Sequence, residues 1–187
     1  INGVNFHTST ITYFEEGFPV YYFRGYKFKG VDPETGNPMF HDLDNSGDLN
    51  DGDLDYIGDA IPDFTYGITL TAGWKGLDFT LFGTGSQGND IFNCINRPDY
   101  AASNKLKEVF YDNRWTADNK SGTVPRAGAQ NMDKYQTSDA LVYDGSFFKI
   151  KQIQLGYTLP KTWMKKIFVN NLRVYGSLDD FFTFTKY

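Results

Sequence analysis

The residues best suited to chemistry lie in one acidic segment between Asp42 and Asp53. Alternate positions carry oxygen-bearing side chains, a glycine stands at the sixth position and an acid at the twelfth, as in calcium-binding loops. Calcium binds about six to eight hard oxygen atoms, and the glycine permits the sharp turn that gathers them. We therefore predict a cation site. Its expected ligands are the side chains of Asp42, Asp44, Ser46 and Asp53, the carbonyl of Asp48, and Asn50 directly or through a water.

Two features of this acidic loop leave alternatives open. Position twelve is Asp53 rather than glutamate, whose longer side chain reaches more easily for bidentate binding, so magnesium is an alternative to calcium. Asp, Asn and Gly are also ordinary residues of a solvated turn, because their side chains and backbone freedom suit turns. The pattern favours metal binding and a metal-free turn about equally. Any cation here is expected to be structural, because His41, which directly precedes the loop, has no serine or cysteine nucleophile in a recognisable motif beside it.

The remaining motifs do not predict catalysis. Gly83-Thr-Gly-Ser-Gln-Gly88 matches a dinucleotide-binding pattern with Glu108 at a suitable distance, but an alternating strand precedes it and no convincing helix follows. Neither His7 nor His41 has a serine or cysteine nucleophile in a recognisable motif beside it, and no sequence context would activate the thiol of Cys94. No pair of carboxylates can be distinguished from those of the acidic loop as a candidate catalytic pair, so a glycosidase has little support. We predict that the protein is not an enzyme.

Composition limits the class of protein. Aromatic residues make up 18% of the 187 residues, yet the mean hydropathy is −0.47 and no apolar run approaches the roughly 20 residues of a transmembrane helix. The net charge is −5, and the sequence contains no basic patch that could contact phosphates, which argues against nucleic acid as a partner. Cys94 is the only cysteine, so no internal disulfide is possible. The first residues do not form a signal peptide, so we expect an internal piece of a longer chain.

The longest element that the sequence predicts is a hairpin between Asp63 and Gln87. Large apolar residues from Phe64 to Trp74 alternate with small or hydroxylic ones over about eleven residues, where a globular strand usually has about five or six. A Lys75-Gly76 turn follows, and the alternation resumes at Leu77. A half-buried antiparallel strand is the commoner source of such a pattern. The length and the aromatic residues at both rims favour instead a strand with lipid on one side and a watery lumen on the other.

The rest of the chain predicts shorter elements and one long connection. We expect strands within 20–31, at 39–41, 142–158 and 171–178, an Asp- and Gly-rich loop at 42–62, one helix near 104–111, and an amphipathic turn at 161–168. The alternation slips near Lys151-Gln152, which predicts a β-bulge. Aromatic residues cluster from Phe181 to Tyr187. Long loops on one side and tight turns on the other are typical of an outer-membrane barrel.

Several segments also share an order and spacing with a known family. They are Gly25–Asp32, Asp42–Asp59, Ile61–Gly67, Trp74–Phe79, Gly85–Ile91, Asp144–Lys151, Leu155–Pro160 and Leu172–Tyr187. From about residue 15 onward they resemble the C-terminal part of the SusC-like (SusC/RagA) TonB-dependent outer-membrane transporters. Family members usually carry Asn where this chain has Asp180.

The resemblance implies an all-β fold of antiparallel strands from a transmembrane β-barrel. Residues 1–187 would be the C-terminal part of the barrel domain, with the plug domain and the closing strand elsewhere in the parent protein. The parent would lie in the Gram-negative outer membrane and import oligosaccharides or peptides with the TonB complex and a SusD-like surface lipoprotein. It would have no catalytic residue.

The alternative is a secreted, calcium-stabilised β-sandwich that binds carbohydrate. Exposed loop aromatics would then stack on sugar rings, although ordinary loop packing explains each of them as well. These aromatics are Tyr100, Tyr111, Trp115 and Tyr135. The two hypotheses differ in what covers the apolar face of Phe64–Trp74, which is protein in a sandwich and lipid in a barrel.

Overall fold

A computed structural model describes residues 5–6, 9–93, 108–164 and 168–186. The chain forms two units. The loop unit comprises residues 1–61 and 90–143, and the sheet unit comprises residues 62–89 and 144–187. Antiparallel β-sheets dominate both units, as the sequence predicts. None of the helices in the described residues has the length and apolar character needed to span a membrane.

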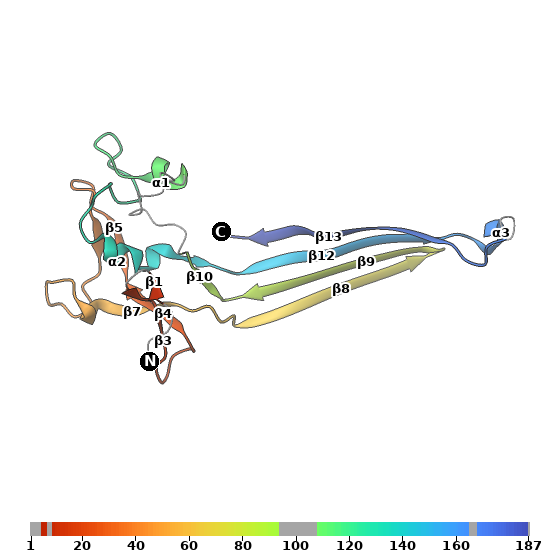
Figure 1. Ribbon diagram of the computed structural model, residues 1–187, viewed down its shortest axis with the longest axis horizontal. Coiled ribbons are helices and arrows are strands. Elements are labelled where there is room, and N and C mark those ends of the chain that lie inside the picture. The colour runs from red at the N-terminus through yellow and green to blue at the C-terminus, as the bar shows by residue number, and fades with distance from the viewer. Residues whose placement is uncertain (1–4, 7–8, 94–107, 165–167, 187) are drawn as a thin grey trace. The chain divides into compact units, whose positions relative to one another are not determined.

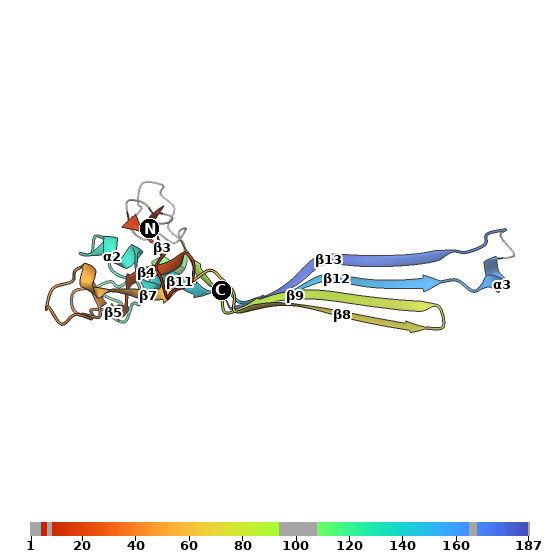
Figure 2. The same ribbon diagram turned by 90° about the horizontal axis from the view of Figure 1, so that it is seen from below.

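The sheet unit contains four long strands. They are β8 (Phe64–Trp74), β9 (Leu77–Gln87), β12 (Phe147–Thr158) and β13 (Arg173–Thr185). Their order in the sheet is β13-β12-β9-β8 (Figure 1). The short helix α3 (Lys161–Met164) lies between β12 and β13 along the chain. Figure 2 shows that β8 and β13 form the two edges of this sheet.

The predicted long hairpin is confirmed. β8 and β9 pair without interruption from Trp74 opposite Leu77 to Phe64 opposite Gln87. Lys75 and Gly76 connect them with φ angles of 48° and 90°. Two positive φ angles are the mark of a type I′ turn, whose twist matches that of the flanking strands. The unbroken register keeps alternate side chains of β8 on opposite faces along its whole length.

The predicted β-bulge is also confirmed, because the register of β12 shifts between Ile150 and Gln152 against both of its neighbours. The prediction for the last strand was too short. β13 continues past residue 178 to Thr185 and includes most of the aromatic cluster. Asp180 has a φ of 51°, and its carboxylate contacts the amino groups of Lys149 and Lys151 at 3.2 and 3.1 Å. This irregular residue interrupts the alternation in the sequence without ending the strand.

The sheet has one apolar and one largely polar face. Residues opposite each other in the register point to the same face, so the apolar side chains of β8 share a face with those of the other three strands. Ten large apolar residues on that face are exposed: Phe64, Ile68, Leu70, Trp74, Leu77, Leu155, Val174, Leu178, Phe182 and Phe184. Across the other face runs a row of Thr71, Thr80, Gln154 and Ser177.

The loop unit consists of short strands and helical turns. Its strands are β1 (Asn5–Phe6), β2 (Ser9–Thr10), β3 (Thr12–Tyr13), β4 (Tyr22–Tyr26), β5 (Phe28–Val31), β6 (Pro38–Phe40), β7 (Leu54–Gly58), β10 (Asp90–Phe92) and β11 (Val142–Asp144), the last of which ends at the boundary with the sheet unit. Its helices are α1 (Glu108–Asn113) and α2 (Met132–Gln136), with 3₁₀ turns at Asp51–Asp53 and Asp139–Leu141. The small core comprises Ile11, Phe23 and Ile57, with Phe92 and Val142 packed against it.

Three predictions for the loop unit need correction. The segment 20–31 forms two strands, because β4 pairs with β3 and β7 whereas β5 pairs with β6. The expected loop 42–62 contains β7, whose apolar residue Ile57 is buried in the core although acidic residues flank the strand. The expected helix near 104–111 is observed as α1, at 108–113, and residues 104–107 lie outside the described residues. The helix α2 was not predicted.

Candidate metal centre

The acidic loop turns sharply in its first half. Asn45 and Gly47 have φ angles of 56° and 84°. The backbone N–H of Ser46 donates to Oδ1 of Asp42 at 3.2 Å and to Oδ1 of Asp44 at 2.9 Å. The N–H of Gly47 donates to Oδ2 of Asp42 at 2.9 Å. The turn therefore fixes two of the predicted carboxylate ligands side by side.

Asp53 closes the loop from its other end. Its carboxylate accepts hydrogen bonds from the N–H of Leu43 at 2.7 Å and of Asn50 at 2.9 Å. Asn50 in turn caps the 3₁₀ turn, since its Oδ1 accepts from the N–H of Gly52 at 2.6 Å. Residues 50 and 53 thus form a reciprocal capping box. This pairing buries Asp53 completely, whereas Asp42 and Asp44 are exposed.

The fold brings three acidic side chains of the loop together. Asp42, Asp44 and Asp53 each offer a carboxylate oxygen, and these three oxygens lie within 4.8 Å of one another. Such a group could bind a metal ion. All of the donors are hard oxygens, which suits calcium or magnesium rather than zinc or copper.

The other predicted ligands converge on the amide of Asn50. Its Nδ2 donates to Oδ2 of Asp44 at 3.1 Å, to Oγ of Ser46 at 2.9 Å and to the carbonyl oxygen of Asp48 at 3.0 Å. An amide N–H₂ group and a cation both require surrounding oxygens. The Nδ2 atom therefore lies where these oxygens would meet an ion, and Asn50 is a donor in this arrangement rather than a ligand.

Hydrogen bonding keeps the loop carboxylates ionised. Bonds from Ser46 and Asn50 lower the pKa of Asp44 from 3.8 to about 2. The N–H of Asn50, and then those of Leu43 and Asp44, lower the pKa of Asp53 against the opposing effect of burial. Both groups are thus negatively charged at neutral pH, which is the state a divalent cation needs.

The remaining sequence motifs lie apart from this loop or have structural explanations. Gly83 and Gly85 lie within β9, where side chains at these positions would overlap the rings of Phe148 and Tyr66. Close packing of aromatic rings, and not a nucleotide, accounts for these glycines. His41 is exposed after β6, whereas His7, Cys94 and Tyr100 lie outside the described residues.

The loop aromatics take different positions. Tyr111 is 65% exposed, with the guanidinium of Arg114 5.7 Å from its ring centroid. Trp115 donates from Nε1 to the carbonyl oxygen of Pro33 at 2.9 Å, and Tyr135 is buried. Ordinary packing thus accounts for two of the four residues considered for sugar stacking.

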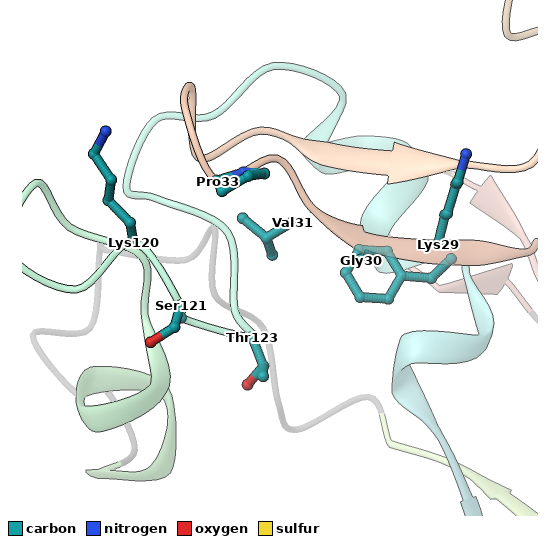
Figure 3. Close-up of a pocket in the computed structure, with 9 residues that line it drawn as sticks. Lys29, Gly30, Val31, Pro33, Lys120, Ser121 and Thr123 are labelled. Atoms are coloured by element: carbon teal, nitrogen blue, oxygen red, sulfur yellow. The ribbon is translucent and has the colours of Figure 1, made fainter.

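One cavity of the loop unit has a volume of about 460 Å³ and lies between β5 and residues 120–123 (Figure 3). The side chains of Lys29 and Lys120 extend away from Val31 and Thr123 in its interior. Lys120 forms an exposed ion pair with Glu34 at 3.0 Å. Among the described residues that line this cavity, neither lysine side chain is thus directed into it, and we assign it no chemistry.

Sequence reasoning missed the structural roles of Asn50 and Asp53. The signal that was present is their spacing, because a capping residue followed three positions later by an acidic residue resembles a capping box. The convergence of oxygens on Nδ2 of Asn50 has no sequence signal, since it depends on how the turn at 45–47 folds.

The chain is similar to several named proteins, although no family model matches it. TonB-dependent receptor P3 of Formosa agariphila is 32% identical over 188 residues, which cover 92% of this chain and 18% of the relative. TonB-dependent receptor SusC of Bacteroides thetaiotaomicron is 25% identical over 168 residues, covering 87% of this chain and 16% of SusC. The chain thus spans less than a fifth of the length of these relatives.

Solved structures agree with the sequence comparison. A chain of the RagAB peptide transporter superposes with a TM-score of 0.75 at 25% identity, covering 93% of this chain and 20% of the transporter chain. The open-open state of the RagAB peptide importer matches all of this chain with a TM-score of 0.71. TonB-dependent receptors reside in the Gram-negative outer membrane and are transporters rather than enzymes, in agreement with the predicted localisation and the predicted lack of catalysis. The chain is therefore homologous to a segment of the SusC/RagA-type TonB-dependent receptors.

Proposed function

We propose that this chain forms part of the transmembrane wall and surface loops of a SusC-like importer. The observation that carries the proposal is the apolar face of the four-stranded sheet. Its strands contain 11, 11, 12 and 13 residues, and a tilted strand crosses a bilayer with about 9–11. The face includes Leu70 and Val174, which are 57% and 61% exposed. Lipid is the environment that suits such a surface.

The alternative of a soluble β-sandwich has less support. A sandwich buries the apolar faces of its sheets against each other. Here the residues that would form such a core, including Phe64, Trp74 and Leu155, are 57%, 68% and 54% exposed in the part of the chain that is described. The homology to outer-membrane receptors supports the barrel as well.

Connectivity gives the proposed orientation. β8 and β9 are joined by the two residues Lys75 and Gly76, whereas residues 88–146 connect β9 to β12. Outer-membrane barrels have short turns in the periplasm and long loops outside. We infer that Lys75-Gly76 faces the periplasm and that the loop unit belongs to the extracellular side.

We infer partners and substrate from the relatives. The rest of the parent chain would complete the barrel through the free edges of β8 and β13 and would supply the plug. A SusD-like surface lipoprotein would cover the extracellular side, and the TonB complex would drive import of oligosaccharides or peptides. The relation to SusC and to a RagAB peptide transporter supports this assignment.

We further propose that the acidic loop binds calcium, or magnesium, as a structural ion. The ligands would be Asp42, Asp44, Asp53, Ser46 and the carbonyl of Asp48. Asn50 would turn its amide or contact the ion through a water. The support is the approach of three carboxylates in a turn whose other oxygens already surround one donor. An ion there would fix the loop that leads into β7.

Transport by the parent protein tests the main proposal. Deleting the parent gene should abolish growth or uptake on one oligosaccharide or peptide nutrient, and loss of TonB should have the same effect. A set of radiolabelled oligosaccharides and peptides offered to wild-type and deleted cells would identify the nutrient. Unchanged uptake of every nutrient in the set by both mutants would contradict an importer.

A further inference from the structure

A smaller cavity of the loop unit, with a volume of about 280 Å³, is lined mainly by polar and charged side chains. Its charged groups come from β4, from the 3₁₀ turn at Asp51–Asp53 and from α2, which lie far apart in the sequence. They are Arg24, Asp51, Asp133 and Lys134, with Tyr13 and Tyr26 beside them. The proposed metal ligands do not line this cavity.

Both cations of this cavity are held on aromatic rings. The guanidinium of Arg24 lies 5.5 Å from the ring centroid of Tyr13. The amino group of Lys134 lies 4.8 Å from the ring centroid of Tyr26 and 3.1 Å from its hydroxyl oxygen. Such contacts stabilise a cation and fix its position while leaving its remaining donors free.

The opposite charges around the cavity do not form ion pairs with each other. Among the described residues, neither Arg24 nor Lys134 has a carboxylate oxygen within 4.0 Å, and neither Asp51 nor Asp133 has a cation within that distance. The chain carries a net charge of −5, so acidic partners are not scarce. Among the described residues, the cavity therefore presents two cations without a carboxylate partner and two carboxylates without a cationic partner to whatever enters it.

We propose that this cavity binds the free C-terminal carboxylate of a peptide. The carboxylate would bind Arg24, whose planar fork of donors matches its two oxygens, and Lys134. The N–H groups of the last peptide residues would donate to Asp51 and Asp133. Capture of a C-terminal carboxylate is a known mode of peptide recognition. This inference rests on the proposed importer function and assigns a substrate class to it.

The lining favours a peptide over a saccharide. Sugar rings stack on open aromatic faces, whereas Tyr13 and Tyr26 each hold a cation against the ring. Tyr26 is also only 5% exposed. Every peptide with a free C-terminus has a carboxylate next to backbone N–H donors. This combination matches the mixed charge of the cavity.

A matched pair of peptides tests the proposal on the intact parent transporter with its surface lipoprotein. The probes are fluorescein-labelled Gly-Ser-Gly-Ala with a free C-terminus and the same peptide as its C-terminal amide, measured by fluorescence anisotropy. We expect the acid to bind about tenfold more tightly than the amide, as for one charge-assisted contact. Arg24→Gln and Lys134→Gln should each remove most of this preference. Arg24→Lys should restore part of it, and Lys120→Gln is the control that should leave it unchanged.

Equal binding of acid and amide by the wild-type protein would overturn the proposal, as would a preference that survives both Gln variants. Tri-galacturonic acid serves as a competitor. Displacement by this acidic saccharide that depends on Arg24, without any binding of the peptide acid, would assign the cavity to saccharides instead. Uptake of the parent protein's nutrient by cells distinguishes a failure of this binding site from a failure of the proposed importer function. Normal uptake with no acid preference would refute only this site, whereas no TonB-dependent uptake at all would refute the importer.

Discussion

The ring of Tyr66 on β8 lies parallel to the ring of Phe148 on β12, with centroids 5.9 Å apart and an angle of 1° between the planes. The two residues are not on neighbouring strands, because β9 runs between them. Gly85 of β9 stands opposite both residues in the register. Its missing side chain lets the rings meet above the strand, and Phe184 of β13 continues the row at 6.3 Å from Phe148.

This arrangement predicts that Gly85→Ala destabilises the sheet unit. A Cβ atom at position 85 would overlap the ring of Tyr66, and overpacking of this kind costs about 1–3 kcal/mol. Thermal unfolding of the parent protein in detergent measures the effect. Gly67→Ala is the matched control, because a Cβ there would meet Phe82 at an ordinary 3.7 Å. Equal losses for the two variants would mean that the aromatic row does not depend on Gly85.

The two faces of β8 should respond differently to a charge. Leu70 lies on the apolar face, and Thr69 lies on the opposite one. Arginine at a lipid-facing site near the bilayer midplane costs about 2–4 kcal/mol, whereas a lumen site tolerates it. We expect Leu70→Arg to lower the unfolding free energy of the parent barrel in lipid by that amount and Thr69→Arg to have a far smaller effect. Similar costs at both positions would argue against a membrane wall.

The acidic loop should bind calcium through Asp44 but not through the side chain of Asp48. Titration calorimetry of the parent protein with calcium chloride should detect one site in the loop that Asp44→Ala removes. Asp48→Ala should retain it, because this residue is expected to supply only its backbone carbonyl, which accepts from Ser46 at 2.9 Å. Absence of calcium and magnesium binding, with unchanged proteolysis of the loop in Asp44→Ala, would leave a metal-free turn.

Tyr135 should make the loop unit sensitive to alkaline pH. Burial raises the pKa of its phenol from 10.0 to about 12. The folded state therefore holds this proton more tightly than the unfolded state. Below about pH 10 the phenol is protonated in both the folded and the unfolded state. The local free energy of unfolding then falls as the pH rises from about 10 to about 12. Cleavage of residues 132–141 by an alkaline protease should increase over this range. Tyr135→Phe keeps the ring that contacts Phe28 at 5.2 Å and should abolish the increase.

The sequence predicted the parts of the fold that depend on local periodicity. The hairpin of β8 and β9 could be read from Phe64–Trp74 because both strands alternate without interruption. The bulge near Lys151 was visible as a change of parity. The length of β13 was not predictable in this way, because its continuation beyond Asp179 depends on Asp180 at a positive φ and on two lysines from a neighbouring strand.

The candidate sites show the same difference between local patterns and long-range packing. The oxygen-rich spacing of the acidic loop is a local pattern, so its carboxylates could be named from the sequence. The cavity of Arg24 and Lys134 could not, because it joins residues 110 positions apart through the packing of α2 beside β4. Likewise, no sequence pattern indicates that Asn50 acts as a donor at the centre of the loop.

The surroundings of the apolar face test the central claim most directly. A bimane label would be attached to a cysteine at Leu70 or at Thr69 of the parent protein in nanodiscs, with its other cysteines replaced. Quenching by lipids brominated in their acyl chains then reports contact with the bilayer interior. We predict strong quenching at position 70 and little at position 69. Equal quenching at both positions, or quenching at position 69 alone, would contradict a membrane wall with its apolar face towards lipid.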